Sequence, residues 1–111
     1  MKEGDVVLTP IPQADGLTKN PPVILLRELP PYRDFLVSGV STQLDREVKG
    51  FDELISQADD DFTSSGLRTT SLVRMGFLAV LPSRGIVGSI GSISQTRRKR
   101  LLAALSKYLT Q

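Results

Sequence analysis

The chain has 111 residues, which is enough for one domain and too few for two. Apolar residues make up 40% of the chain, so it can bury a core, but aromatic residues are only 5%, so this core must be mainly aliphatic. Because cysteine and histidine are absent, the sequence excludes disulfides, thiol nucleophiles, Ser–His–Asp triads and zinc sites built from these residues. The net charge of +2 does not by itself mark a nucleic-acid-binding protein, although nine of the 14 basic residues are arginine, which suits bidentate phosphate contacts.

The sequence carries no sign of membrane insertion or secretion. No apolar run approaches the roughly 18–20 residues that a membrane span requires. The opening Met-Lys-Glu-Gly-Asp lacks the apolar segment of a secretory signal peptide. We therefore expect a protein of the cytoplasm.

Six short β-strands are predicted from aliphatic and β-branched runs that lie between turn residues. They cover residues 4–10, 22–29, 34–41, 72–75, 77–81 and 86–93. Residues 10–22 contain four prolines and few apolar residues, which indicates an exposed loop, more mobile than the strands and placed to gate a substrate groove. A turn at residues 30–33 predicts that the second and third strands form a hairpin. Gly76, between the fourth and fifth strands, would permit a bend or bulge.

Two helices are predicted, one internal and one terminal. Apolar residues spaced i, i+3, i+4 and i+7 from Phe51 to Ala58 predict a short amphipathic helix. We interpret the three aspartates at residues 59–61 as its solvated, frayed end, since negative charge opposes the helix dipole there. Ser94 is the expected N-cap of a terminal helix of roughly fifteen residues. Its apolar stripe contains Leu101, Leu105, Tyr108 and Leu109. These elements favour a small β-barrel that carries helices.

Three local motifs have structural explanations. Gly85, Gly88 and Gly91 recur every third residue, but no Lys-Ser/Thr pair follows, so we assign them to a bend or a close backbone approach and not to a phosphate loop. Residues 59–61 lack the spacing and glycine of a calcium loop, so no metal site is expected. The basic residues 97–100 occupy the positive end of a helix, which indicates either an anionic partner or a solvated face, and we favour the solvated face.

Two groups of polar side chains lie at strand ends and are candidates for a functional site. Residues 41–43 read Ser-Thr-Gln and close the third strand, whereas Arg74 interrupts an otherwise apolar strand. A buried arginine is unfavourable unless it is paired, so Arg74 should face a cleft or a carboxylate. Each feature also has a structural explanation, because Ser and Thr form turns and Arg74 could make a salt bridge at a barrel rim.

The order of these motifs resembles the MazF/PemK family, the toxins of type II toxin–antitoxin systems. The resemblance spans residues 1–111 as a single domain. Its motifs are the opening strand at residues 4–7, the Lys-Asn-Pro-Pro and aliphatic strand at residues 19–26, the hydroxyl-rich strand end at 40–43, the Val-Arg strand at 71–74, and the closing strand and helix at 88–91 and 101–102.

The resemblance implies a mainly β (β+α) fold, an SH3-like β-barrel with a short internal helix and a long C-terminal helix, assembled as a homodimer. It implies a sequence-specific, metal-independent endoribonuclease without a cofactor, an mRNA interferase that cleaves single-stranded RNA. The expected partners are RNA, an antitoxin, and operator DNA bound as the toxin–antitoxin complex. The reaction would be internal attack of a ribose 2′-hydroxyl on its phosphate, which suits a chain without histidine or cysteine. By motif position, Ser41 and Arg74 would be catalytic, and Lys19, Asn20, Thr42 and Gln43 would bind the substrate.

The chain departs from the family pattern at two positions. Pro21 stands where the family has a catalytic arginine, and Gly76 stands where some relatives have an acid. Losing an oriented cation costs about 100- to 1,000-fold in rate. Lys19 and Arg27 are the alternative cations, although lysine lacks the bidentate fork. Three hypotheses follow: an active or attenuated toxin, an inactive relative that binds RNA, DNA or its antitoxin in a regulatory role, and a small interaction module without a nucleic-acid role.

Overall fold

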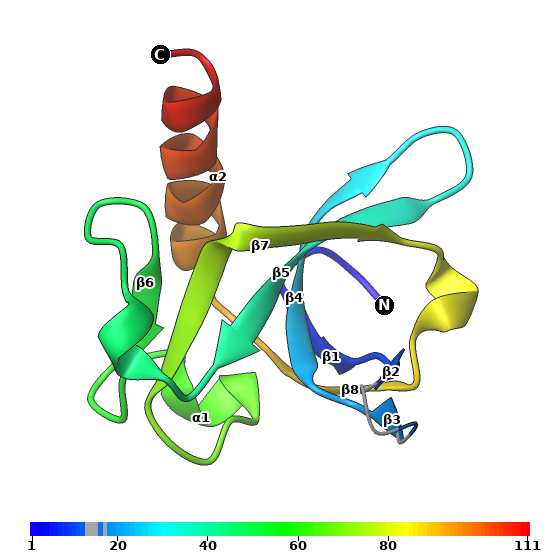
Figure 1. Cartoon of the computed structure of the whole chain (residues 1–111), viewed down its shortest axis with the longest axis horizontal. Coiled ribbons are helices and arrows are strands. Elements are labelled where there is room, and N and C mark those ends of the chain that lie inside the picture. Colours follow the sequence, from blue (N-terminus) through cyan, green and yellow to red (C-terminus); the bar gives the residue numbers. More distant parts are fainter. Residues whose placement is uncertain (13–15, 17) are drawn as a thin grey trace.

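A computed structural model shows a curled antiparallel sheet with one long helix standing beside it (Figure 1). The structure describes residues 1–12, 16 and 18–111. The strands are β1 (Asp5–Leu8), β2 (Ile11–Pro12), β3 (Thr18–Lys19), β4 (Pro22–Leu29), β5 (Asp34–Ser41), β6 (Glu53–Ile55), β7 (Ser71–Leu81) and β8 (Gly88–Ser92). The helices are α1 (Phe62–Ser65) and α2 (Gln95–Leu109), with short 3₁₀ turns at Leu44–Arg46 and Ser83–Gly85.

Six strands form the main sheet in the order β6-β7-β5-β4-β1-β8, and every neighbouring pair is antiparallel. The sheet curls into a half-barrel, with β6 and β8 at its two edges (Figure 1). A separate hairpin, β2 and β3, lies beside the β1–β8 side of the sheet. The predicted mainly β fold with a long terminal helix is therefore confirmed.

Strands β4 and β5 have the bounds that the sequence predicts and pair as a hairpin. Their long apolar runs are explained by burial on both faces, because successive side chains point to opposite sides of a sheet. One face carries a helix-side core, which consists of Val6, Ile24, Leu26, Ile55, Val73, Met75, Ile93, Leu101 and Leu105. The other face carries a far-side core, which consists of Val7, Val23, Leu25, Phe35 and Val37.

The helix predicted from Phe51 to Ala58 is wrong. This segment contains β6, which pairs with the start of β7 and buries Ile55. The Asp52 carboxylate explains the difference, since it accepts hydrogen bonds from the backbone N–H groups of Val48 and Met75, both at 2.8 Å. These bonds fold the chain into a turn and tie it to β7, so tertiary contacts override the helical spacing. The short internal helix is α1, further along the chain.

The fourth and fifth predicted strands are one continuous strand, β7, with an irregularity at the predicted glycine. The pairing with β5 passes from Ser38 opposite Leu78 directly to Gly39 opposite Arg74. Residues 75–77, which include Gly76, therefore have no partner in β5 and form a bulge. The bulge directly follows Arg74 along β7.

Helix α2 begins and ends where the sequence predicts. The Ser94 hydroxyl caps it by accepting a hydrogen bond from the Arg97 backbone N–H at 3.1 Å. Leu101 and Leu105 pack into the helix-side core, whereas Tyr108 and Leu109, also assigned to the apolar stripe, are exposed. In the described part of the chain, no helix combines the length and apolar character needed to cross a membrane.

Helix α1 rests directly on β8, and glycines make this close approach possible. A Cβ atom on Gly91 would overlap the backbone of Ser64 and Ser65. A Cβ on Gly66 would likewise overlap the carbonyl group of Ile90. The interpretation of the repeated glycines as a close backbone approach is confirmed at Gly91, whereas the space around Gly88 is open.

Candidate functional site

The register of the sheet brings Ser41 and Arg74 to the same face. Gly39 of β5 pairs with Val23 on one side and with Arg74 on the other, and Ser41 pairs with Leu72. Ser41 and Arg74 are therefore diagonal neighbours on adjacent strands, a relation that typically puts the Cα atoms about 7–8 Å apart. Their face is the one that carries the far-side core, opposite to α2. The structure thus unites the two residues that the sequence analysis assigned to catalysis.

Ser41 is partly buried and takes part in a local turn. Its Oγ accepts a hydrogen bond from the backbone N–H of Gln43 at 3.0 Å. The structural explanation for the Ser-Thr-Gln cluster is therefore correct, but the turn uses only the acceptor side of the hydroxyl and leaves its proton able to donate. Thr42 and Gln43 follow on the surface, and both are exposed.

Arg74 is partly exposed, and within the described residues it forms neither a salt bridge nor a side-chain hydrogen bond. The rim salt bridge considered for it is not present there. A guanidinium carries five N–H donors in a planar fork that matches a phosphate. Among the described residues Arg74 therefore has no carboxylate partner, and it lies on the same face of the sheet as the Ser41 hydroxyl.

The sequence predicts an exposed loop over residues 10–22, but the described part of this segment contains the hairpin of β2 and β3. Asn20 follows this hairpin and lies at the same end of the sheet as Ser41. Strand β4 starts at Pro22, and Val23 pairs with Gly39, so Lys19 and Asn20 come just before the strand end that adjoins Ser41. Asn20 is exposed. The side chain of Lys19 and residues 13–15 and 17 lie outside the described residues. The mobility of this segment and its gating of a groove stay predictions.

Arg27, proposed as an alternative cation, is in the wrong place. It pairs with Leu36 four positions along β4 from Val23, which separates it from the Arg74 end by about 13 Å of strand. Its guanidinium is already paired with the Glu3 carboxylate, which raises the pKa of Arg27. Arg27 therefore lies away from the Ser41 and Arg74 end of the sheet and already has a carboxylate partner.

The sequence did not predict a role for Phe77, whose ring lies against Gly39. A Cβ atom on Gly39 would lie 2.8 Å from Cδ1 and 3.1 Å from Cγ of the Phe77 ring. The ring therefore lies against the bare backbone of Gly39, the residue that pairs with Arg74. Phe77 is 45% exposed. The signal in the sequence was an aromatic residue directly after the glycine of a predicted bulge.

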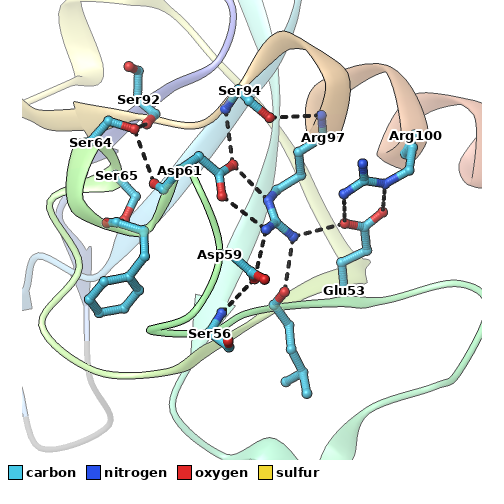
Figure 2. Close-up of polar contacts among 12 residues, drawn as sticks. Glu53, Ser56, Asp59, Asp61, Ser64, Ser65, Ser92, Ser94, Arg97 and Arg100 are labelled. Atoms are coloured by element: carbon cyan, nitrogen blue, oxygen red, sulfur yellow. Dashed lines mark hydrogen bonds and ion pairs between the residues drawn. The ribbon is translucent and has the colours of Figure 1, made fainter.

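A second polar cluster surrounds Arg97, at the start of α2 (Figure 2). All five N–H groups of this guanidinium are used. Nε and Nη2 bind the two Asp61 oxygens at 2.8 and 3.0 Å, Nη2 binds Asp59 at 2.9 Å, and Nη1 binds Glu53 and the Leu54 carbonyl, both at 2.9 Å. Arg97 is only 5% exposed. Hydrogen bonding to Arg97 lowers the pKa of Asp61 from 3.8 to about 2, although burial opposes this shift.

This Arg97 cluster corrects two interpretations from the sequence. Residues 97–100 do not form a simply solvated helix face, and residues 59–61 are not a frayed helix end. Arg97 and Asp61 are buried against each other, and Arg100 forms a two-bonded pair with Glu53 at 3.1 and 2.9 Å. The carboxylates offset the unfavourable position of these cations at the positive end of α2. The basic run therefore fastens α2 to the rest of the fold.

Among the described residues, no group of three or more acidic side chains is arranged to hold a metal ion. On the opposite face from α2, Ser41 and Arg74 offer a hydroxyl and a cation, groups that can bind an anion such as a phosphate diester.

Comparison with known proteins supports the fold and goes no further. No family model matches the sequence, and neither does any curated protein. Among solved structures, the toxin MazF-mt6 of Mycobacterium tuberculosis is similar, with a TM-score of 0.67 over 96% of this chain and 96% of that chain. The sequence identity is 18%, so the similarity establishes the fold alone. The MazF-like fold that the sequence motifs predict is therefore confirmed.

Proposed function

We propose that this protein is an endoribonuclease that cleaves single-stranded RNA and acts as the toxin of a type II toxin–antitoxin pair. The observation that carries the proposal is the register of β5 and β7, which puts Arg74, without a salt bridge among the described residues, on the same face of the sheet as Ser41. The MazF-like fold is consistent with this role. Asn20, Thr42 and Gln43 lie at the same end of the sheet. Their motif positions support a function in binding the RNA on either side of the phosphate that is cleaved.

The chemistry requires little from the protein beyond position and charge. The ribose O2′ attacks the adjacent phosphorus and forms an O2′–P bond while the P–O5′ bond breaks, which gives a 2′,3′-cyclic phosphate and a 5′-hydroxyl. Neither a serine nor an arginine is a strong base, so we assign to water the removal of the 2′ proton and the protonation of O5′. Arg74 would neutralise the charge of the pentacoordinate phosphorane, and Ser41 would donate a hydrogen bond to one of its oxygens.

The second candidate is an RNA-binding relative that cleaves weakly or not at all. Pro21 favours it, because this residue occupies the position of the family arginine and Arg27 lies too far away to substitute. Gly76 favours it too, since the acid found there in some relatives is absent. This candidate would still bind RNA, or operator DNA together with its antitoxin. RNA binding without cleavage would support it, and failure to bind RNA at all would favour the third hypothesis, a plain interaction module.

A homodimer is part of the proposal. Exposed apolar side chains occur on the outer half of β7 and at the end of α2. They are Leu78 at 38%, Val80 at 55% and Leu109 at 69% exposed. A small domain gains stability by covering such residues with a second copy. Light scattering should give twice the chain mass at micromolar concentration, and a stable monomer would contradict the dimer.

The experiment that tests the function is cleavage of a long single-stranded RNA by the purified protein with EDTA present. Matched RNA with 2′-deoxy residues is the control, because it lacks the nucleophile. We expect cleavage of the RNA and none of the deoxy strand. Cleavage that requires an added metal ion, or that also occurs on the deoxy strand, would contradict the proposed reaction. Growth arrest on induction in cells, relieved by an antitoxin, tests the biological role separately.

A further inference from the structure

Phe77 differs from the other phenylalanines in its surroundings. Phe35 is 1% exposed within the far-side core, and Phe51 and Phe62 pack against the helix-side core. Phe77 is 45% exposed and lies in the bulge formed by residues 75–77. A ring that is half in solvent keeps part of its surface available for contact with another molecule.

The position of the Phe77 ring depends on Gly39. With a Cβ atom at position 39 only 2.8 Å from Cδ1 and 3.4 Å from Cε1, any larger residue there would have to displace the ring. Glycine allows a close approach to the backbone. The bulge and the glycine act together, because the bulge sets Phe77 three residues beyond Arg74 and Gly39 lets its ring lie across the strand that pairs with Arg74.

We propose that Phe77 is a stacking platform for one base of the RNA, next to the phosphate that Arg74 holds. This inference rests on the proposed function and names the residue that positions the substrate. Single-stranded RNA is commonly bound by stacking unpaired bases on aromatic side chains while cations hold the backbone. The partly exposed ring of Phe77, against Gly39, and Arg74, which has no salt bridge among the described residues, provide this combination on one face of the sheet.

Such a platform would act by position and not by reading the base identity. Every base has a π-face, so stacking tolerates changes of sequence. By fixing one nucleotide beside Ser41 and Arg74, Phe77 would hold the neighbouring 2′-hydroxyl in line for attack. Phe77 is therefore a positioning residue, and its loss should weaken RNA binding as well as slow cleavage.

The test uses binding of a fully 2′-O-methylated single-stranded RNA, which cannot be cleaved, measured by fluorescence anisotropy. The Phe77→Leu variant should bind about tenfold more weakly, the loss expected for one base–aromatic stack. Phe77→Tyr, which keeps the ring, should bind like the wild type. The matched control is Tyr32→Leu, which removes an aromatic ring that is 81% exposed in the turn after β4. This control should leave binding unchanged.

A change in the RNA isolates stacking from a merely structural effect. Abasic nucleotides placed one at a time should reveal a position at which the wild type loses about tenfold in affinity, and this loss should vanish in Phe77→Leu, because the two changes remove the same contact. Gly39→Ala, which displaces the ring without removing it, should behave like Phe77→Leu. This variant and the abasic series on the wild type keep the test decisive if Phe77→Leu does not fold.

The outcomes separate the inference from the proposed function. If the wild type binds and cleaves RNA while Phe77→Leu binds equally well with the same abasic profile, stacking is refuted and the proposed function stands. If no abasic position weakens binding of the wild type, stacking is refuted in the same way. If the wild type neither binds nor cleaves RNA, the proposed function is wrong, and the stacking role of Phe77 is refuted as well.

Discussion

Two arginines of this protein, Arg97 and Arg74, occupy opposite situations. Arg97 is 5% exposed, and all five of its N–H groups bind Asp61, Asp59, Glu53 and the Leu54 carbonyl. Arg74 is partly exposed, and within the described part of the chain its guanidinium has no carboxylate partner. A guanidinium whose donors are satisfied stabilises the fold, whereas one whose donors remain open can bind an anion. The comparison therefore separates the structural arginine from the candidate functional one.

The largest expected effect is on stability, from Arg97→Ala. Removing one partner of a buried ion pair leaves Asp61 buried without its counter-charge, which should cost about 3–5 kcal/mol of unfolding free energy. Urea denaturation followed by circular dichroism measures it. The control is Arg100→Ala, whose side chain is 54% exposed and whose loss should cost at most about 1 kcal/mol. Equal losses of unfolding free energy in the two variants would contradict the structural role assigned to Arg97.

The next effect is on catalysis, from Pro21→Arg. If the proposed reaction is right, adding a cation at residue 21 should raise the rate of the chemical step by up to about 100-fold, because the added charge would act where negative charge develops. Single-turnover cleavage of RNA measures it. If the variant folds and the rate is unchanged while the parent already cleaves rapidly, another residue holds the cationic role and the assignment of Pro21 is wrong.

Acid should destabilise the Arg97 cluster. The pKa of Asp61 is lowered from 3.8 to about 2, chiefly by its hydrogen bonds to Arg97, so its carboxylate stabilises the folded state above pH 3.8. That contribution should be lost as the pH falls from about 4 through about 2. Urea midpoints across this range should drop for the wild type more steeply than for Asp61→Asn, which cannot titrate. Parallel curves would show that Asp61 is not responsible.

The smallest effect is expected from Arg27→Ala. Its salt bridge with Glu3 is exposed, with 59% of the Arg27 side chain accessible, so its loss should cost at most about 1 kcal/mol. Because Arg27 lies away from Arg74 along β4, RNA cleavage should be unchanged. A large loss of cleavage with stability intact would restore Arg27 as the cation that compensates for Pro21.

The sequence predicts those elements whose local pattern agrees with their tertiary contacts. Strands β4 and β5 read as continuous apolar runs because both of their faces are buried, and α2 carries a capping serine and a buried apolar stripe. Strand β6 was missed because the helical spacing of its apolar residues is coincidental. Its true determinants, Asp52 and Glu53, bind partners 23 and 44 residues away, which no local pattern reveals.

The same reasoning explains which parts of the candidate site were predictable. Ser41 and Arg74 stood out as polar groups in apolar strands, and their motif positions resembled those of a known family. Phe77 did not stand out, because its exposure depends on a bulge and on a glycine 38 positions earlier in the chain. The Arg97 cluster was misread for a similar reason, since neighbours in sequence do not show which charges meet in space.

The measurement that tests the central claim most directly is RNA cleavage by Arg74→Ala beside Arg84→Ala, with EDTA present. Neither arginine forms a salt bridge among the described residues. Arg84 serves as the control because it lies in the turn after β7, where it is exposed. We expect Arg74→Ala to cleave about 100- to 1,000-fold more slowly than the wild type, with an unfolding free energy within about 0.5 kcal/mol of it. Arg84→Ala should match the wild type in both measurements. Undiminished cleavage by Arg74→Ala, or the same loss in both variants, would contradict the account.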